Sequence, residues 1–167
     1  MAQFERLYIA QYCAEKWAEG GYTLGVPLGP IPPDLVKSLG YEGASAYFRP
    51  WRPEVDAVKF FSEGLLLLEG KVFKVLDALA KLRWYGELAL KTEEFRSWLG
   101  APVTLRVVTP RATDVFRTLA EASGVQIDIY QTPEVMAHAA KYEKYWTAEY
   151  QRERQLRQEK LKELGLG

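Results

Sequence analysis

The sequence predicts an α/β domain with a mixed central β-sheet flanked by helices, followed by a C-terminal helical extension. Three observations support this prediction. The chain has 167 residues, enough for one domain with a full hydrophobic core. Two β-prone segments are joined by a tight turn, which gives an antiparallel pair, and the last two are joined by a helical segment. A helical crossover makes neighbouring strands parallel, so the sheet is expected to be mixed.

The first third of the chain is predicted to hold a helix, a short strand and an insertion. Residues 4–19 have apolar side chains at helical spacing, and two glycines follow them, which is typical of a helix end. Residues 22–29 favour a short strand. Residues 26–53 mix prolines and glycines, so we expect a long irregular insertion with one helical turn at 34–39. Insertions of this kind are either binding elements or dispensable.

The middle of the chain predicts a hairpin and two helices. Residues 55–61 and 64–72 are β-prone and are separated by a Ser-Glu-Gly turn, which favours an antiparallel hairpin. Residues 73–90 carry an apolar stripe at helical spacing. Residues 91–100 predict a further short helix, with Thr92 as its N-cap.

The last part of the domain predicts a strand, a helix and a strand. Residues 103–109 and 125–131 are β-prone, and residues 113–124 are helical in pattern, with Thr113 as the N-cap and a glycine at the end. The crossover between the two strands is expected to be right-handed, with the strands parallel.

The domain is expected to span residues 1–132, and residues 133–167 to form a C-terminal helix. The first half of this helix carries an apolar and aromatic stripe, which we expect to pack on the domain or across a dimer. The second half is charged with both signs and is expected to stay in solvent. The stripe consists of Val135, Ala139, Tyr142, Trp146 and Tyr150.

Composition excludes several classes of protein. Lysine plus arginine and aspartate plus glutamate both number 22, for a formal net charge of zero, which argues against a generally basic nucleic-acid-binding protein. Cys13 is the single cysteine and His138 the single histidine, so we expect no disulfide and no zinc site, and we assign Cys13 to the core. No signal peptide or membrane-spanning run is evident, so a cytoplasmic location is expected. The absence of asparagine, with plentiful charge, suggests a thermophilic source.

The stretch LLLLEGK, residues 65–71, places charge directly after a strongly apolar strand. Burying charge there is costly unless something compensates it. On a strand, Glu69 and Lys71 project to the same side about 7 Å apart. Asp56 begins the antiparallel partner strand, so it is expected beside them. The charges are therefore expected to compensate one another and a bound ion.

Two converging carboxylates suit Mg²⁺ or Mn²⁺, which prefer oxygen ligands and retain water. Lys71 would orient or help deprotonate a water, or hold the phosphate that the water attacks. Such a cation makes its water a nucleophile and stabilises charge in the transition state, so the sequence predicts phosphodiester hydrolysis. The alternative is a structural salt bridge at a strand end.

Asp56 followed by Glu69-x-Lys71, within an order of helix, three strands, helix, strand, helix and strand, resembles the PD-(D/E)xK nuclease superfamily. This superfamily includes restriction endonucleases, archaeal Holliday-junction resolvases and phage and repair nucleases. The resemblance covers about residues 4–131 and implies a restriction-endonuclease-like fold. It also implies that Asp56, Glu69 and the backbone carbonyl of Gly70 bind the metal and that Lys71 is the catalytic lysine.

The resemblance leaves the subfamily open. Val55 stands where the motif has proline before its first acid. Many members of the superfamily add an acid from the first helix, and Glu5 is the preferred candidate for a further metal ligand, with Glu15 and Glu19 as alternatives. The segment LRWYGELAL, residues 82–90, resembles exonuclease-like or restriction-like members more than resolvases.

Six further residues are candidate DNA contacts, and they lie on either side of the predicted site. Arginines before the first acid suit phosphates, and a tryptophan between them can stack on a base; the alternative is a proline-rich loop held by a half-buried tryptophan. Basic residues on the following helix either track the DNA backbone or form a solvated face. The first group is Arg49, Trp51 and Arg52, and the second is Lys74, Lys81 and Arg83.

The leading hypothesis is a metal-dependent DNA nuclease, acting as a structure-selective, junction-resolving endonuclease of phage or repair and recombination pathways. An exonuclease or a nickase is the next choice. The resemblance also implies a homodimer, since many members of the superfamily are symmetric dimers that place two sites on two strands, and the C-terminal helix offers a surface for this. The main alternative is a nuclease fold without turnover that binds DNA or acts in assembly, and a third is an RNA-directed or nucleotide-directed hydrolase.

Overall fold

A five-stranded sheet forms the centre of the computed structural model, which describes residues 2–143 and 148–164. The strands lie in chain order. The first three are antiparallel, and the third, fourth and fifth are parallel. The predicted mixed α/β sheet is therefore confirmed. The strands are β1 (Tyr22–Pro27), β2 (Glu54–Phe61), β3 (Gly64–Gly70), β4 (Val103–Thr109) and β5 (Val125–Ile129).

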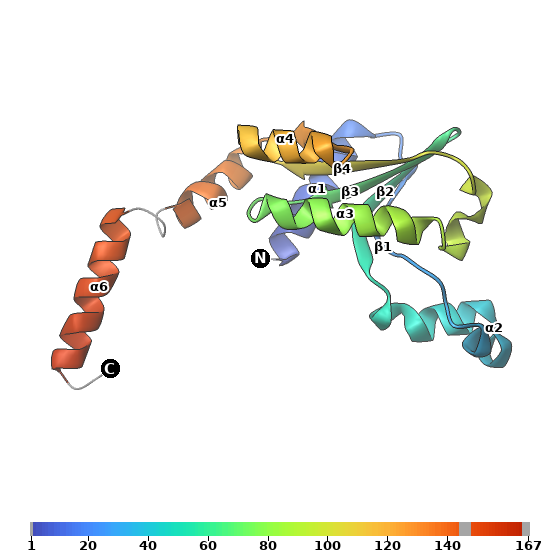
Figure 1. Ribbon diagram of the computed structural model, residues 1–167, viewed down its shortest axis with the longest axis horizontal. Helices are drawn as coiled ribbons and strands as arrows, with labels where there is room; N and C mark the ends of the chain where they lie inside the picture. Colours follow the sequence, from blue (N-terminus) through green and yellow to red (C-terminus); the bar gives the residue numbers. More distant parts are fainter. Residues whose placement is uncertain (1, 144–147, 165–167) are drawn as a thin grey trace. The chain divides into compact units, whose positions relative to one another are not determined.

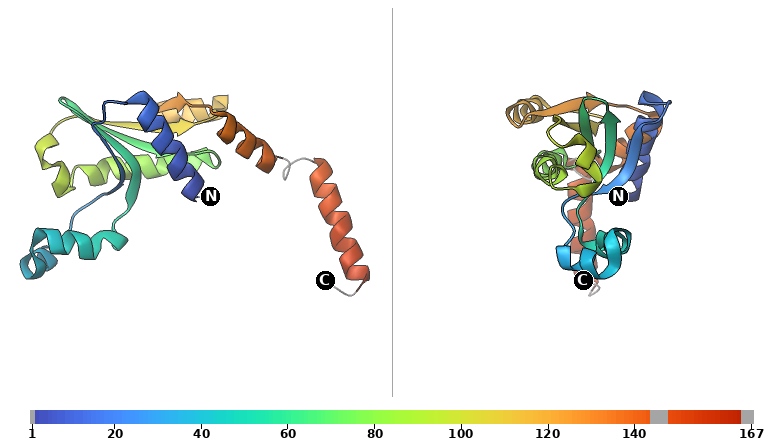
Figure 2. Two further views of the ribbon diagram at one scale, coloured as in Figure 1. Left: turned by 180° about the vertical axis from the view of Figure 1, so that it is seen from behind. Right: turned by 90° about the vertical axis from the view of Figure 1, so that its right-hand side faces the viewer.

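Helices cover both faces of this sheet. α1 (Ala2–Lys16) packs on one face against β2 and β3, whereas α3 (Val75–Ala89) and α4 (Asp114–Ala122) pack on the other (Figure 2). The predicted cap of α4 is confirmed, because the Thr113 hydroxyl accepts a hydrogen bond from the Phe116 N–H at 3.2 Å. These three helices agree with the sequence prediction.

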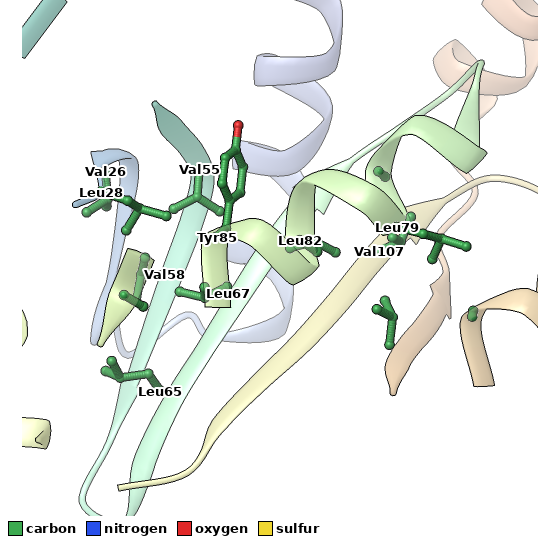
Figure 3. Close-up of a cluster of buried hydrophobic side chains, with 14 of the residues drawn as sticks. Val26, Leu28, Val55, Val58, Leu65, Leu67, Leu79, Leu82, Tyr85 and Val107 are labelled. Carbon is green, nitrogen blue, oxygen red and sulfur yellow. The ribbon is translucent and has the colours of Figure 1, made fainter. Parts of the chain in front are cut away.

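The four leucines of β3 are buried because both faces of this central strand are covered. Leu65 and Leu67 belong to the apolar cluster beneath α3, together with Val58 of β2 and Leu82 of α3 (Figure 3). The side chains of alternate residues point to opposite faces, and every residue of β3 from Gly64 to Gly70 is buried. The continuous leucine run is therefore the pattern of a strand buried on both sides.

The prediction of an irregular insertion is wrong for most of that segment. Helix α2 (Pro33–Phe48) and the 3₁₀ helix η1 (Arg49–Trp51) occupy it and lie beyond the end of the sheet (Figure 1). Pro33 stands in the first helical turn, where a missing N–H costs little. Gly40, with φ 69°, divides α2 by a kink, which glycine tolerates readily. Proline and glycine thus mark a helix start and a kink here, and no long loop.

The short helix after α3 is the 3₁₀ helix η2 (Glu93–Trp98), but Thr92 does not cap it as predicted. The Thr92 hydroxyl instead donates to the Leu88 carbonyl and accepts from the Gly29 N–H, both at 2.8 Å. This side chain therefore joins the end of α3 to the chain segment after β1.

The chain divides into two compact units, with the boundary between Tyr130 and Gln131. The second unit contains α5 (Pro133–Glu143) and α6 (Ala148–Glu163), where the sequence predicted a single helix. Trp146 of the predicted stripe lies outside the described residues.

The two C-terminal helices differ in burial. Val135 and Ala139 of α5 are buried, whereas residues 152–163 of α6 are exposed. None of the described helices combines the length and the hydropathy needed to cross a bilayer.

Candidate functional site

The candidate site forms where β2 and β3 part. Their ladder runs from Phe61 opposite Gly64 to Ala57 opposite Leu68, so Asp56 and Glu69 are the next residues on the two strands. The Asp56 carboxylate there accepts a hydrogen bond of 2.8 Å from the backbone N–H of Gly70. A side chain thus binds an N–H at the point where the ladder stops. The predicted juxtaposition of Asp56 with the end of β3 is confirmed.

Glu69 is a buried carboxylate whose two oxygens have different surroundings. Its side chain is 2% exposed, and Oε1 lies 3.3 Å from Lys81 Nζ and 3.6 Å from Lys71 Nζ. Oε2 is buried without a hydrogen-bond partner among the described residues. Burial, and next the charge of Asp56, raise the pKa of Glu69 above its ordinary value, and the two lysines only partly oppose this. The ionised side chain is therefore under-compensated.

The charge of Asp56 is also only partly compensated by its surroundings. Burial raises the pKa of Asp56, while the Gly70 N–H and the Lys71 ammonium act in the opposite direction. The half-buried Asp56 and the buried Glu69 repel each other, because the medium around them screens charge less than bulk water does. A cation between Asp56 and Glu69 would relieve both the repulsion and the unpaired oxygen.

Gly70 separates Glu69 from Lys71 because α1 lies close to the backbone there. A Cβ on Gly70 would be 3.2 Å from the Ile9 Cβ and 3.5 Å from the Glu5 carbonyl oxygen. The absence of a side chain lets α1 bring Glu5 to the site, where Oε2 lies 3.1 Å from Lys71 Nζ. Oε1 of Glu5 accepts from the Val72 N–H at 3.3 Å. The structure thus places Glu5 in the site, paired with Lys71 and the backbone.

Five charged side chains make up this site, which we call the charged cluster: Glu5, Asp56, Glu69, Lys71 and Lys81. Burial lowers the pKa of Lys71, but the hydrogen bond and charge of Glu5 and the charge of Glu69 outweigh it, so the pKa is raised. Lys71 is therefore an ammonium ion at neutral pH. Three carboxylates against two ammonium groups leave a formal excess of one negative charge.

The donor set fits a hard divalent cation bound largely through water. Over residues 2–143 and 148–164, no group of three or more acidic, histidine or cysteine side chains is arranged to hold a metal. A cation would therefore depend on Asp56 and Glu69 and complete its shell with main-chain oxygen and water, which is common for Mg²⁺. The unpaired Oε2 of Glu69 is the observation that favours this fit.

Helix α3 adds two residues whose roles the sequence reasoning missed. Lys81, predicted as a DNA contact, reaches Glu69 instead. Tyr85 lies one turn further on the same face and is 5% exposed. Burial, then the charges of Glu69 and Asp56, raise its pKa to about 12. Figure 3 shows the Tyr85 hydroxyl directed away from the leucines of the core. The four-residue spacing of Lys81 and Tyr85 places both on one face of α3, and this was the sequence signal that could have assigned them to the site.

Arg52 requires a correction. Its side chain is 1% exposed, and it donates to both carboxylate oxygens of Glu94 at 2.7 and 2.9 Å and to the Gly29 carbonyl at 2.9 Å. Burial alone would raise the pKa of Glu94, but the Arg52 hydrogen bonds outweigh it and the pKa is lowered. Arg52 is thus a structural residue that a DNA phosphate does not reach.

The other two residues of that segment are accessible. The Arg49 side chain is 56% exposed and pairs with Glu54 at 3.3 Å. Trp51 is 64% exposed, and its ring lies against those of Tyr47 and Phe48, with centroids 5.7 and 6.0 Å away. The alternative of a half-buried tryptophan holding a loop is therefore wrong.

The remaining candidates lie outside the charged cluster. Lys74 is exposed just before α3. Arg83 is exposed and lines a separate depression that also involves β4. The alternative acids, Glu15 of α1 and Glu19 in the turn after it, are exposed, and Glu15 accepts a hydrogen bond from Gln11.

Comparison with known proteins gives little further information. No family model matches the chain, and no curated protein matches it. Among solved structures, the crystal structure of a repair endonuclease from Pyrococcus abyssi is similar, with a TM-score of 0.44 and 19% sequence identity over 75% of this chain and 46% of that chain. The chain thus corresponds to less than half the length of that protein. We base the functional proposal on the site geometry.

Proposed function

We propose that this chain is a divalent-metal-dependent nuclease that hydrolyses phosphodiester bonds in DNA, as a structure-selective endonuclease of repair or recombination. The main supporting observation is the convergence of two carboxylates, the half-buried Asp56 and the buried Glu69, beside the Lys71 ammonium. A homodimer would place one such site on each DNA strand.

Each side chain has a role that follows from its surroundings. Asp56 and Glu69, with the Gly70 carbonyl, would hold Mg²⁺ or Mn²⁺. When bound, such a cation stabilises negative charge in the transition state and makes a water more acidic. Lys71 is kept protonated by Glu5 and Glu69, so it acts as a hydrogen-bond donor to the attacked phosphate or to the water, and a role as a base is disfavoured.

The test is cleavage of supercoiled plasmid and of a branched DNA substrate by the purified chain, with Mg²⁺, with Mn²⁺ and with EDTA. We expect cation-dependent cutting that Glu69→Gln and Lys71→Ala abolish, because each removes a charge from the cluster. Glu19→Gln, which changes an exposed acid in the turn after α1, is the matched control and should cut like wild type. Equal cutting by all four proteins would contradict the proposal.

A second candidate is a DNA-binding or assembly module without turnover. Both lysines of the charged cluster are already ion-paired, and the described residues hold no three-acid metal site. DNA binding by gel shift, with no cutting of any substrate under any cation, would favour this second function.

A further inference from the structure

We propose that a pocket between α1 and the paired strands β1 and β2 binds one nucleotide of the DNA strand, next to the bond that is cut. This inference rests on the proposed nuclease function and adds a substrate subsite to it. The pocket has a volume of about 390 Å³, within the range of small-ligand sites. The residues that the inference uses are Arg6, Leu7, Leu24, Gly25, Arg49 and Glu54.

Two arginines converge on one carboxylate at this pocket. Arg6 Nη2 lies 3.0 Å from Glu54 Oε1, and Arg49 Nη2 lies 3.3 Å from Glu54 Oε2. The arginine side chains are 70% and 56% exposed, so both guanidinium groups are accessible from solvent. A phosphate offers more acceptor oxygens than Glu54 does, and guanidinium groups bind phosphates through paired hydrogen bonds.

The lining of the pocket also has an apolar part. Leu7 of α1 is 65% exposed and Leu24 of β1 is 42% exposed, and both line the pocket. A single exposed leucine has no special meaning, but here two lie in the same pocket as two arginines. A nucleotide has this chemistry, with an anionic phosphate at one end and a largely apolar sugar edge and base face at the other.

The pocket adjoins the charged cluster through Asp56, which lines it and also binds the Gly70 N–H. Gly25 stands across from Asp56 in the strand pairing, between Leu24 opposite Ala57 and Val26 opposite Val55. A Cβ on Gly25 would lie 2.9 Å from Glu54 Oε1, so the glycine leaves room for the carboxylate that the two arginines share, one strand position from Asp56. A nucleotide in this pocket would therefore be a direct neighbour of the phosphodiester held at the charged cluster.

The test uses the full-length chain in EDTA and thymidine 5′-monophosphate as the probe, followed by amide proton–nitrogen correlation spectra. We expect saturable shifts of the Leu24 and Gly25 amides, and binding at least about tenfold weaker in Arg6→Ala. Glu54→Gln should bind roughly two- to fivefold more tightly, since the arginines lose their competing partner. Arg96→Ala, which removes an exposed arginine paired with a neighbour on η2, is the control and should bind like wild type.

Thymidine and inorganic phosphate, tested separately, should each bind more weakly than the nucleotide. Unshifted pocket amides, equal binding by Arg6→Ala and wild type, or binding of phosphate as tight as that of the nucleotide would each overturn the subsite. A chain that cuts DNA and does not bind the probe contradicts this inference alone. A chain that binds the probe in the pocket and never cuts DNA contradicts the proposed function, and with it the substrate role of the site.

Discussion

Replacing Glu69 with glutamine should stabilise the protein in the absence of metal while abolishing cleavage. The reason is the under-compensated charge of Glu69, whose side chain is 2% exposed and lies near the half-buried carboxylate of Asp56. Glutamine has nearly the same shape without the charge, so it removes the repulsion from Asp56. Functional sites commonly retain such strain at a cost in stability.

The size of this effect follows from the contacts of the side chain. A buried polar atom without a partner costs about 1–3 kcal/mol and more when it carries charge, as Glu69 Oε2 does, and glutamine leaves only a neutral atom in that place. The substitution also loses the ion pairs with Lys71 and Lys81, each worth up to about 1 kcal/mol. The free energy of unfolding of Glu69→Gln should therefore exceed that of wild type by about 1 kcal/mol, which corresponds to a rise in Tm of about 2–4 °C for a chain of this size.

The assay is thermal unfolding of both proteins in EDTA across a pH series. The folded state holds the Glu69 proton more tightly than the unfolded state, whose pKa is near the ordinary 4.5. Wild type therefore loses stability as the pH rises through the higher folded-state pKa, and loses none below the unfolded-state value. The advantage of the variant should vanish in acid and be largest at neutral pH. A Tm several degrees below wild type at neutral pH would refute the reasoning.

Three further predictions concern the scaffold of the site. Arg52→Leu should lower the free energy of unfolding by about 2–3 kcal/mol in urea titrations. The loss is smaller than for a fully buried ion pair, because Glu94 is 32% exposed. DNA affinity should not change, and weaker DNA binding by a folded variant would instead support Arg52 as a DNA contact. Because the pKa of Glu94 lies below its ordinary 4.5, the contribution of this pair is present above that value and is lost as the pH falls through the folded-state pKa; an unfolding difference between wild type and Arg52→Leu that stays constant into acid would contradict this. Gly70→Ala places a methyl group 3.2 Å from the Ile9 Cβ, so a loss of about 1–3 kcal/mol and reduced cleavage are expected, whereas unchanged stability would argue against the close approach of α1.

Local patterns were sufficient to predict the sheet and the central pair of acids. The leucines of β3 and the turn before them predicted a buried strand in a hairpin, and an antiparallel hairpin necessarily brings Asp56 beside Glu69. The Thr113 cap was equally local, because a capping side chain and the N–H that donates to it are three residues apart. Features set by short-range spacing could thus be read without a structure.

Features set by distant partners could not be predicted. Arg52 is a residue type that often contacts phosphates, but here it is buried in an ion pair with Glu94, 42 residues later in the chain. Thr92 follows a capping pattern, yet the Gly29 N–H, 63 residues earlier, binds its hydroxyl. Lys81 was assigned to a solvated or DNA-facing surface, since nothing in the helix pattern shows that Glu69 lies within 3.3 Å of it.

The central claim is that Asp56 and Glu69 together bind a divalent cation. A titration with Mn²⁺, followed by electron paramagnetic resonance, tests it most directly. The free Mn²⁺ signal is measured with wild type, Asp56→Asn, Glu69→Gln and the control Glu19→Gln. We predict a saturable site in wild type and in the control that is lost in both cluster variants. Mn²⁺ binding that is absent from wild type, or unchanged in Asp56→Asn and Glu69→Gln, would contradict the account.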